Sequence, residues 1–256
     1  MCLINFQFQD HPRYKLVIAA NRDEFYKRPT EKAHFWNDDP QILAGRDLMQ
    51  MGTWLGVSTS GRIAALTNFR DPSLPDANKR SRGAIVRNFL ETDMPPCLFL
   101  ESINAEDYTG FNLVAGTADE LFYYNNIDQK ASAIEAGIHG LSNHFLDTPW
   151  PKVIKGKNYL ERYLSEHEKV QLPDLFEILA DADQAAEPDL PDTGVGIEFE
   201  KILSPMFIKT ADYGTRSSTV VLVDHNDHLT FAERVYDNGV LKGEQVFEFG
   251  ITKSQK

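Results

Sequence analysis

The first residue whose type and position suggest chemistry is Cys2, directly after the initiating methionine. If Met1 is removed, Cys2 carries a thiol and a free α-amine on the same residue. The α-amine has an ordinary pKa of about 7.7–8.0, so it can accept a proton near neutral pH. A side chain activated by its own α-amine is an established type of nucleophile. The alternative is that Cys2 packs as a small hydrophobic residue at the start of a strand.

Four polar residues in a row, Asn-Arg-Asp-Glu, end the apolar segment that begins at Tyr14. If this segment forms a hairpin with residues 3–8, the start of the first strand lies beside the end of the second. The hairpin then brings Cys2 close to Asn21, Arg22 and Asp23. The alternative is a charged strand end that leads into a solvated loop.

The expected neighbours of Cys2 would change its reactivity. A guanidinium such as that of Arg22 favours the thiolate, and a carboxylate such as that of Asp23 can hold an ammonium group. We therefore expect a lowered pKa for the Cys2 thiol. Cys97 lies in an apolar segment and is expected to be inert.

Most of the elements that must position these residues are predicted strands joined by short turns. Alternating or continuously apolar segments are separated by Gly, Ser, Asp and Asn residues, which is the pattern of β-hairpins. The expected pairs are 3–8 with 14–21, 53–58 with 62–69, 111–117 with 120–126, and 217–224 with 228–235, with 246–251 as a further edge strand.

Helical spacing of apolar residues is confined to fewer segments. The expected helices are 83–92, capped by Ser81, then 149–167, and a third that begins at Pro173. Segments 70–80 and 183–196 are expected to be loops. Consecutive hairpins imply antiparallel sheets with helices packed outside, which is an α+β layered fold. We expect one domain over residues 1–256.

The composition limits the classes of function. The 256 residues hold 26 Lys and Arg against 38 Asp and Glu, a net charge of −12, which argues against a nucleic-acid partner. No apolar stretch approaches the roughly 18 residues that span a bilayer. The first residues do not form a secretory signal, and two cysteines are too few for a disulfide framework. We expect a soluble cytoplasmic protein without an integral membrane segment.

Several longer motifs resemble those of a known family. They are MCLI, HPRYKLVIAANRDEFYKRP, ILAGRD, GTWLGV, GRIAALTNFRDP, SRGAIV, GLSN and YGTRSSTVVLV. The sequence resembles the NRDE-motif family, also called the transport and Golgi organisation protein 2 family, from Met1 to about Val235. This resemblance implies a four-layer αββα sandwich of antiparallel sheets, like that of the N-terminal nucleophile hydrolases.

The resemblance also implies roles for single residues. Wider relatives, which include conjugated bile acid hydrolases, penicillin V acylases and acid ceramidases, use an N-terminal Cys, an early Arg and Asp, an oxyanion-hole Asn and a late Arg. The implied catalytic residues here are Cys2, Arg22, Asp23, Asn143 and Arg216. Without the resemblance, Asn143 is an ordinary turn residue and Arg216 a strand-entry arginine in a surface salt bridge.

One departure from the pattern concerns spacing. The relatives separate the early Arg and Asp by two residues, whereas Arg22 and Asp23 are adjacent. Neighbouring strand residues point to opposite faces, so both cannot face Cys2 unless the strand bends. Asn21 or Glu24 would then take one of the two roles.

Substrate contacts are expected from Asn21, Asn68, Trp54 and Arg82. Asn68 is a weaker match to a polar residue that lines the relatives' sites. Arg82 belongs to a basic run near the helix start at Ser81, which could hold an anionic group such as a propionate or phosphate. The alternative is a solvated basic face. His225 and His228 fit a polar hairpin turn, and we expect no metal and no cofactor.

Two functions from different classes are expected. The first is an N-terminal-cysteine amidohydrolase that cleaves a carbon–nitrogen amide bond of a small or acylated substrate through a thioester, with Asn143 and Asn68 stabilising the oxyanion. The second is a non-catalytic haem or acyl-CoA/lipid carrier with the same fold, because the resemblance implies links to haem trafficking and lipid metabolism. A scaffold for secretory organisation rests on the family name alone.

Overall fold

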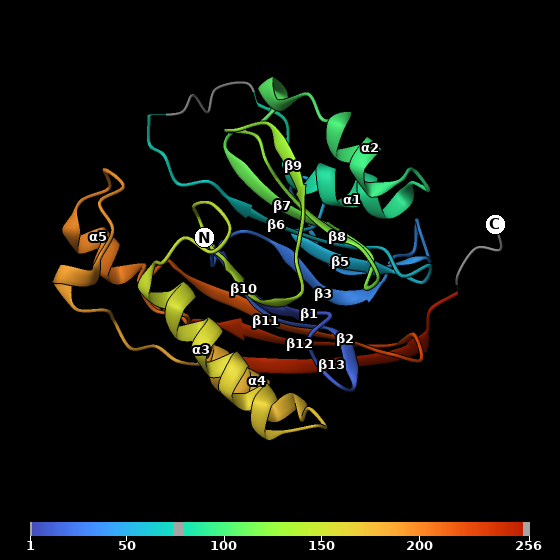
Figure 1. The fold of residues 1–256 in the computed structure, drawn as a ribbon. Coiled ribbons are helices and arrows are strands. Elements are labelled where there is room, and N and C mark those ends of the chain that lie inside the picture. Colours follow the sequence, from blue (N-terminus) through green and yellow to red (C-terminus); the bar gives the residue numbers. More distant parts are fainter. Residues whose placement is uncertain (1, 74–78, 253–256) are drawn as a thin grey trace.

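Two antiparallel sheets face each other in the computed structural model (Figure 1). It describes residues 2–73 and 79–252. Within those residues, one sheet has the strand order β10-β1-β2-β11-β12-β13, and the other runs from β3 to β9 in sequence order. The strands of the first sheet are β1 (Cys2–Phe8), β2 (Tyr14–Phe25), β10 (Gly137–Leu141), β11 (Tyr213–Asp224), β12 (His228–Asp237) and β13 (Val240–Gly250).

The second sheet is built from strands that are adjacent in the sequence. They are β3 (Thr30–Phe35), β4 (Ile42–Asp47), β5 (Leu55–Ser58), β6 (Ile63–Asn68), β7 (Phe111–Gly116), β8 (Leu121–Asn125) and β9 (Lys130–Ala133). The α-helices are α1 (Gly83–Glu91), α2 (Pro96–Glu101), α3 (Pro151–Glu166), α4 (Leu172–Leu179) and α5 (Ile197–Ile202). Helices α3 and α4 pack on the first sheet, while α1 and α2 pack on the second (Figure 1). The four layers confirm the expected αββα arrangement.

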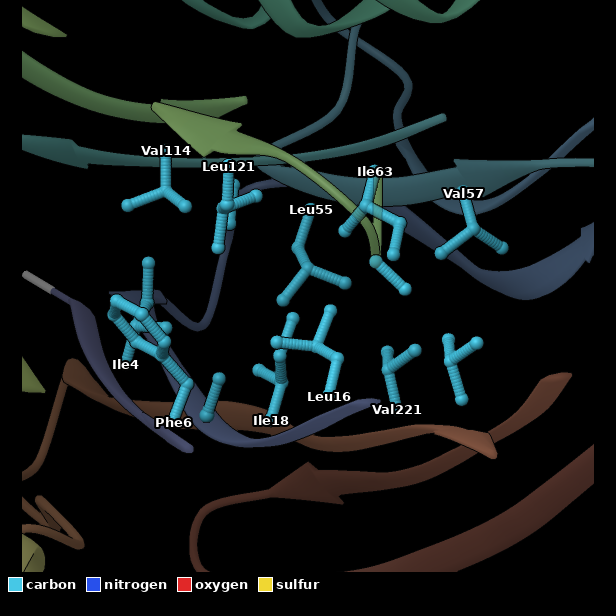
Figure 2. Close-up of a cluster of buried hydrophobic side chains, with 14 of the residues drawn as sticks. Ile4, Phe6, Leu16, Ile18, Leu55, Val57, Ile63, Val114, Leu121 and Val221 are labelled. Atoms are coloured by element: carbon cyan, nitrogen blue, oxygen red, sulfur yellow. The ribbon is translucent and has the colours of Figure 1, made fainter. Parts of the chain in front are cut away.

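The core between the sheets follows from alternation along each strand. On β1, Ile4 and Phe6 point into the space between the sheets, where Figure 2 shows them together with side chains of both sheets. Leu3, one residue earlier, packs on the other face with Trp150 and Val153 of the α3 region. Full burial of one such side chain stabilises the fold by about 1.5–3 kcal/mol. The same alternation therefore fixes which face of β1 and β2 each polar residue takes.

The expected hairpins are confirmed. The pairs β1–β2, β5–β6, β7–β8 and β11–β12 are antiparallel, and β13 is an edge strand that begins at Val240 rather than at residue 246. The helices at 83–91, 151–166 and 172–179 are also confirmed. Of the expected loops, 183–196 holds only a short 3₁₀ turn (Glu187–Asp189), and part of 70–80, at 74–78, lies outside the described residues.

Two expectations about local structure need correction. Ser81 does not cap α1: the N-cap is Arg82, which makes no side-chain cap hydrogen bond, and Ser81 offers only its carbonyl oxygen to Ala84 N at 3.2 Å. The strands β3, β4, β9 and β10 were not predicted. They contain charged residues or glycine, which interrupt the alternation of apolar and polar residues that indicates a strand.

Candidate active site

Strand pairing sets the residues around Cys2. In the β1–β2 pair Cys2 lies opposite Arg22, and in the β2–β11 pair Arg22 lies opposite Ser217. Residues directly opposite each other share a face, so Cys2 and Arg22 both point to the inner side of the sheet. Asp23 lies opposite Thr215, and its carboxylate accepts a hydrogen bond from the Thr215 hydroxyl at 2.7 Å.

A cavity of about 270 Å³ opens at this end of the two sheets, with Cys2 in its wall. Its wall comes from both sheets, from residues 50–54 before β5 and from residues 79–83 at the start of α1. Gly52 and Gly83 touch there, because a Cβ added to Gly52 would lie 2.5 Å from the backbone of Gly83. Ionisable side chains in the wall are Arg22, Arg28, Arg46, Lys79, Arg80 and Arg82, together with Asp23, Glu24, Asp47 and Glu233.

The structure brings together six of the residues singled out from the sequence. Cys2, Arg22, Asp23, Asn68, Trp54 and Arg82 all line the cavity. The guanidinium of Arg22 donates to the Thr30 hydroxyl at 3.2 Å and lies 3.9 Å from the Glu24 carboxylate. Arg82 donates to the carbonyl oxygen of Gly110 at 3.1 Å. The first β-hairpin and the start of α1 thus supply the two sides of one pocket.

The protonation of Cys2 differs from the expectation. Burial raises the pKa of the partly buried thiol above its ordinary value, and the nearby Asp23 carboxylate acts in the same direction. Hydrogen bonding to the Asp23 backbone and the charge of Arg22 lower this pKa by smaller amounts. The expected lowered pKa is therefore wrong, because desolvation outweighs one guanidinium. Burial also raises the pKa of Asp23, against the opposing effects of Lys152 and Thr215.

Asn143 lies near Cys2 but does not line the cavity. It is fully buried, and its Nδ2 donates to the carbonyl oxygen of Asn68 at 2.9 Å. The Ser142 hydroxyl lies 3.1 Å from its Oδ1 and 3.0 Å from the carbonyl oxygen of Cys2. Asn143 thus ties the end of β6 to the segment after β10. Of the two asparagines expected near an oxyanion, only Asn68 reaches the cavity wall.

Arg216 is not brought to Cys2. The register of β11 shifts between Thr215 and Ser217, so Arg216 is the extra residue of a β-bulge. Its Nη1 donates to the carbonyl oxygens of Phe25, Tyr26 and Arg28 at 2.9, 2.9 and 3.0 Å. Arg216 therefore does not take the expected catalytic position. It holds the turn between β2 and β3 instead.

Asn21 also lies outside the cavity wall. It is fully buried, and its Nδ2 donates to the carbonyl oxygens of Leu179 and Met206 at 2.8 and 2.9 Å. Its Oδ1 accepts from the Ser218 hydroxyl at 2.6 Å. These contacts place the amide under α4, on the side of the sheet away from Cys2, so the expected substrate contact is not supported by its position.

Among the buried ionisable residues that sequence reasoning missed, two have pKa values shifted toward neutral pH. Glu233 on β12 lines the cavity, and its Oε1 accepts from the backbone N–H of Ala33 at 2.6 Å. Burial raises the pKa of Glu233 to about 7. The signal for it is a Glu at an inward position of an alternating strand, between Phe231 and Val235. Lys152 on α3 is 3% exposed, and burial lowers its pKa to about 8; no sequence pattern distinguishes it from an ordinary helix lysine.

Two further findings bear on function. Across residues 2–73 and 79–252, no three His, Cys, Asp or Glu side chains gather as they would around a metal ion. His225 lies with its Nε2 3.1 Å from the carbonyl oxygen of His11. Within the same residues, no helix is long and apolar enough to cross a membrane.

The layers and the sheet order are those of an N-terminal nucleophile hydrolase-like fold, which two solved structures share. A conjugated bile acid hydrolase from Clostridium perfringens is 8% identical and superposes with a TM-score of 0.54 over 99% of each chain. The Caenorhabditis elegans ortholog of N-acylethanolamine-hydrolyzing acid amidase is 10% identical and has a TM-score of 0.51, with 86% of this chain and 92% of that one covered. These likenesses establish the fold.

Within that class, the chain belongs to the Transport and Golgi organisation 2 family, whose family model matches residues 1–238. The Bos taurus homolog is 39% identical over 256 aligned residues, which cover 91% of this chain and 92% of the relative. The Homo sapiens homolog is 38% identical with the same coverage, and the Drosophila melanogaster protein is 27% identical over 91% of each chain. The family name itself specifies no reaction.

Proposed function

We propose that the protein is an amidohydrolase in which Cys2 attacks a carbon–nitrogen amide bond of a small or acylated substrate. The observation that carries this proposal is the position of Cys2 in a polar cavity, opposite Arg22 and beside Asp23. The names of the two structural relatives point the same way, because one hydrolyses N-acylethanolamines and the other conjugated bile acids.

The raised pKa of Cys2 decides how the thiol would act. A thiol whose pKa is raised by burial is not a preformed thiolate, so a base must take its proton as attack occurs. In the proposed reaction that base is the α-amine of Cys2 after removal of Met1, which lies outside the described residues. The sulfur bonds to the carbonyl carbon, and the amine that leaves takes the proton. Water then hydrolyses the thioester and restores the thiol.

The neighbours of Cys2 divide the remaining tasks. In the proposed reaction Asp23 holds the α-amine, and Arg22, opposite Cys2, balances charge on the cavity side of the sulfur. Asn68 is the proposed amide donor to the oxyanion, while Asn143 fixes the backbone of Asn68 through the 2.9 Å hydrogen bond. Loss of one oxyanion donor typically lowers the rate by about 10²–10³-fold.

A second candidate function is supported by the basic side of the cavity. Lys79 and Arg82 line it while donating to backbone carbonyl oxygens, those of Glu106 and Gly110. A cavity wall that contains these positive charges suits an anionic ligand, such as a haem propionate or the phosphates of acyl-CoA. In such a carrier Cys2 would be dispensable, and Arg82 would govern affinity.

The experiment compares Cys2→Ala and Arg82→Ala with the unaltered protein and with Cys97→Ala as a matched cysteine control. Intact mass first establishes whether Met1 is removed. Hydrolysis of a panel of fatty-acyl amides and the affinities for haem and acyl-CoA are then measured. For a hydrolase, Cys2→Ala lowers turnover by roughly 10³-fold or more, because the nucleophile acts in the chemical step. Full activity in Cys2→Ala, with weakened binding in Arg82→Ala, would instead establish the carrier.

A further inference from the structure

Glu233 is a buried carboxylate of the cavity wall that the proposed reaction does not use. Only 3% of the residue is exposed, and its hydrogen-bond donors are neutral: the Ala33 N–H, 2.6 Å from Oε1, and the Ser217 hydroxyl. Within residues 2–73 and 79–252, no Lys, Arg or His nitrogen lies within 4 Å of this carboxylate. The buried carboxylate therefore has no cationic partner in this part of the chain.

Two cations act on Glu233 only from a distance. The charges of Arg22 and His34 lower its pKa, but burial outweighs them and raises it. Arg22 lies 3.9 Å from the carboxylate of Glu24, and His34 lies 3.8 Å from that of Glu31. Neither cation is paired with Glu233, so neither recovers the cost of burying its ionised form.

A residue that only held β12 against β3 would not need to be a glutamate. Glutamine carries an oxygen for the Ala33 N–H, has nearly the same shape and cannot ionise. What Glu233 offers and glutamine does not is a negative charge that a cationic ligand can neutralise. Buried titratable groups in a cavity are typical of functional sites.

A glycine leaves room beside the second carboxylate oxygen. A Cβ added to Gly45 of β4 would lie only 3.3 Å from Oε2 of Glu233, and Gly45 itself lines the cavity. A larger side chain at position 45 would fill the space next to the carboxylate. The cavity thus reaches Oε2 past a residue that has no side chain.

Glu233 and Cys2 lie on the same face of one sheet but on different strands. Leu229 and Phe231, which precede Glu233 at alternate positions of β12, point into the core between the sheets, so Glu233 takes the inner face as Cys2 does. From β1 to β12 there are three strand spacings, or about 14 Å. A ligand that contacts both residues must therefore extend across β2 and β11.

The opposite sheet keeps the basic wall away from Glu233. Lys79 and Arg82 donate to carbonyl oxygens of the segment before β7, whereas Glu233 is held at Ala33 of β3. In that sheet β3 and β7 are separated by β4, β5 and β6. Strand β12 packs against β3, and β1 packs against β6. A cation at Glu233 is therefore remote from Lys79 and Arg82.

We propose that Glu233 binds an ammonium group of the substrate, at the end of the cavity away from the Cys2 sulfur. The substrate class is then an amide that also carries a protonated primary amine, separated from the amide carbonyl by a short chain. The ammonium keeps its protons, and no bond to Glu233 forms or breaks. The inference rests on the proposed function for the position of the amide, but ammonium binding can be measured without turnover.

The test uses Cys2→Ala protein, which lacks the proposed nucleophile, and measures dissociation constants by calorimetry at pH 8. At this pH the Glu233 carboxylate is ionised and a primary alkylamine is protonated. The probes are 4-aminobutanamide, 6-aminohexanamide and 8-aminooctanamide, together with N-acetyl-1,5-diaminopentane for the reverse amide orientation. Each is paired with the amide in which a methyl group replaces the ammonium: pentanamide, heptanamide, nonanamide and N-hexylacetamide.

We expect at least one ammonium probe to bind about tenfold or more tightly than its methyl-ended partner, because an ion pair offsets the burial of the carboxylate. Glu233→Gln should remove this preference and leave the methyl-ended probe within about twofold. Glu248→Gln, at an exposed glutamate of β13, is the matched control and should change neither affinity. Equal affinities within every pair, or no binding by any ammonium probe, overturn the inference. If Glu233→Gln does not fold, Glu233→Met decides in the same way.

The outcomes separate the inference from the proposed function. An ammonium preference that depends on Glu233, combined with full hydrolytic activity in Cys2→Ala, supports the cation site and overturns the hydrolase. No ammonium preference, combined with lost turnover in Cys2→Ala, overturns the cation site and leaves the hydrolase in place.

Discussion

Two buried polar clusters border the same strand, β2, on its opposite faces. On the helix side, Asn21 uses its amide fully: its nitrogen donates to two backbone carbonyl oxygens, and its oxygen accepts from Ser218. On the cavity side, Arg22 lies beside Cys2 and shares the pocket with Glu233. Residues 21 and 22 are neighbours in the sequence, yet alternation sends one to each cluster.

The two clusters differ in the charge and in the hydrogen bonding of their buried polar groups. The Asn21 cluster is neutral, and its bonds lie between 2.6 and 2.9 Å. At the cavity, burial moves the pKa of Glu233 to about 7. Groups that can gain or lose a proton near neutral pH are suited to chemistry, whereas satisfied neutral groups are suited to holding strands and helices together.

The largest effect on stability is expected at the satisfied cluster. Asn21→Ala removes the partner of two carbonyl oxygens and one hydroxyl, all buried, and should lower the free energy of unfolding by about 3–4 kcal/mol. Asn226→Ala, at an exposed turn, is the control and should change it by less than about 0.5 kcal/mol. Urea unfolding measures both. A loss below about 1 kcal/mol for Asn21→Ala would show that the hydrogen bonds of the Asn21 cluster do not stabilise the fold as proposed.

A pH-dependent effect is expected at Glu233. Its pKa is about 7 in the folded protein and about 4.5 when unfolded, so the folded state binds the extra proton between these values. Stability therefore falls as pH rises from 4.5 to 7, and the loss is complete above pH 7. Glu233→Gln keeps an oxygen for the Ala33 N–H but cannot ionise.

The unfolding free energy of Glu233→Gln should therefore exceed that of the unaltered protein by about 2–3 kcal/mol at pH 8, and the two should converge toward pH 4.5. Urea unfolding at several pH values tracks the difference. Parallel curves for the two proteins would show that Glu233 does not titrate in this range, and the cavity cluster would then resemble the Asn21 cluster.

The sequence predicts the fold better than it predicts the site. Apolar alternation predicts the hairpins because each strand buries one face, and the β1–β2 pairing follows directly from it. Family motifs identify Cys2, Arg22 and Asp23, which do line the cavity. Lys152 was missed because its burial depends on how closely α3 approaches β1, and that distance is set by Gly156 and Asn5. Tertiary packing of this kind leaves no periodic signal in the sequence.

Arg216 shows how a motif can be matched while its geometry differs. The sequence around it is strand-like, and only the bulge in the β2–β11 pairing turns its guanidinium toward the carbonyl oxygens of Phe25, Tyr26 and Arg28. A bulge adds one residue to a strand and reverses the face taken by the later residues of that strand. The position of Arg216 in the chain therefore does not determine whether it reaches the cavity.

The smallest effect is expected at Arg216. It is also the effect that best distinguishes a structural role from a catalytic one. Arg216→Gln removes a donor shared by three carbonyl oxygens of a partly exposed turn and should lower the free energy of unfolding by about 1–2 kcal/mol. Turnover per folded molecule should fall by no more than about threefold, because the guanidinium does not line the cavity.

Arg22→Gln, which alters the residue opposite Cys2, is the matched comparison and should lower turnover by about 10²-fold or more. If Arg216→Gln loses as much turnover as Arg22→Gln while remaining folded, Arg216 belongs to the reacting centre, and the division of β2 into a holding face and a reacting face is wrong.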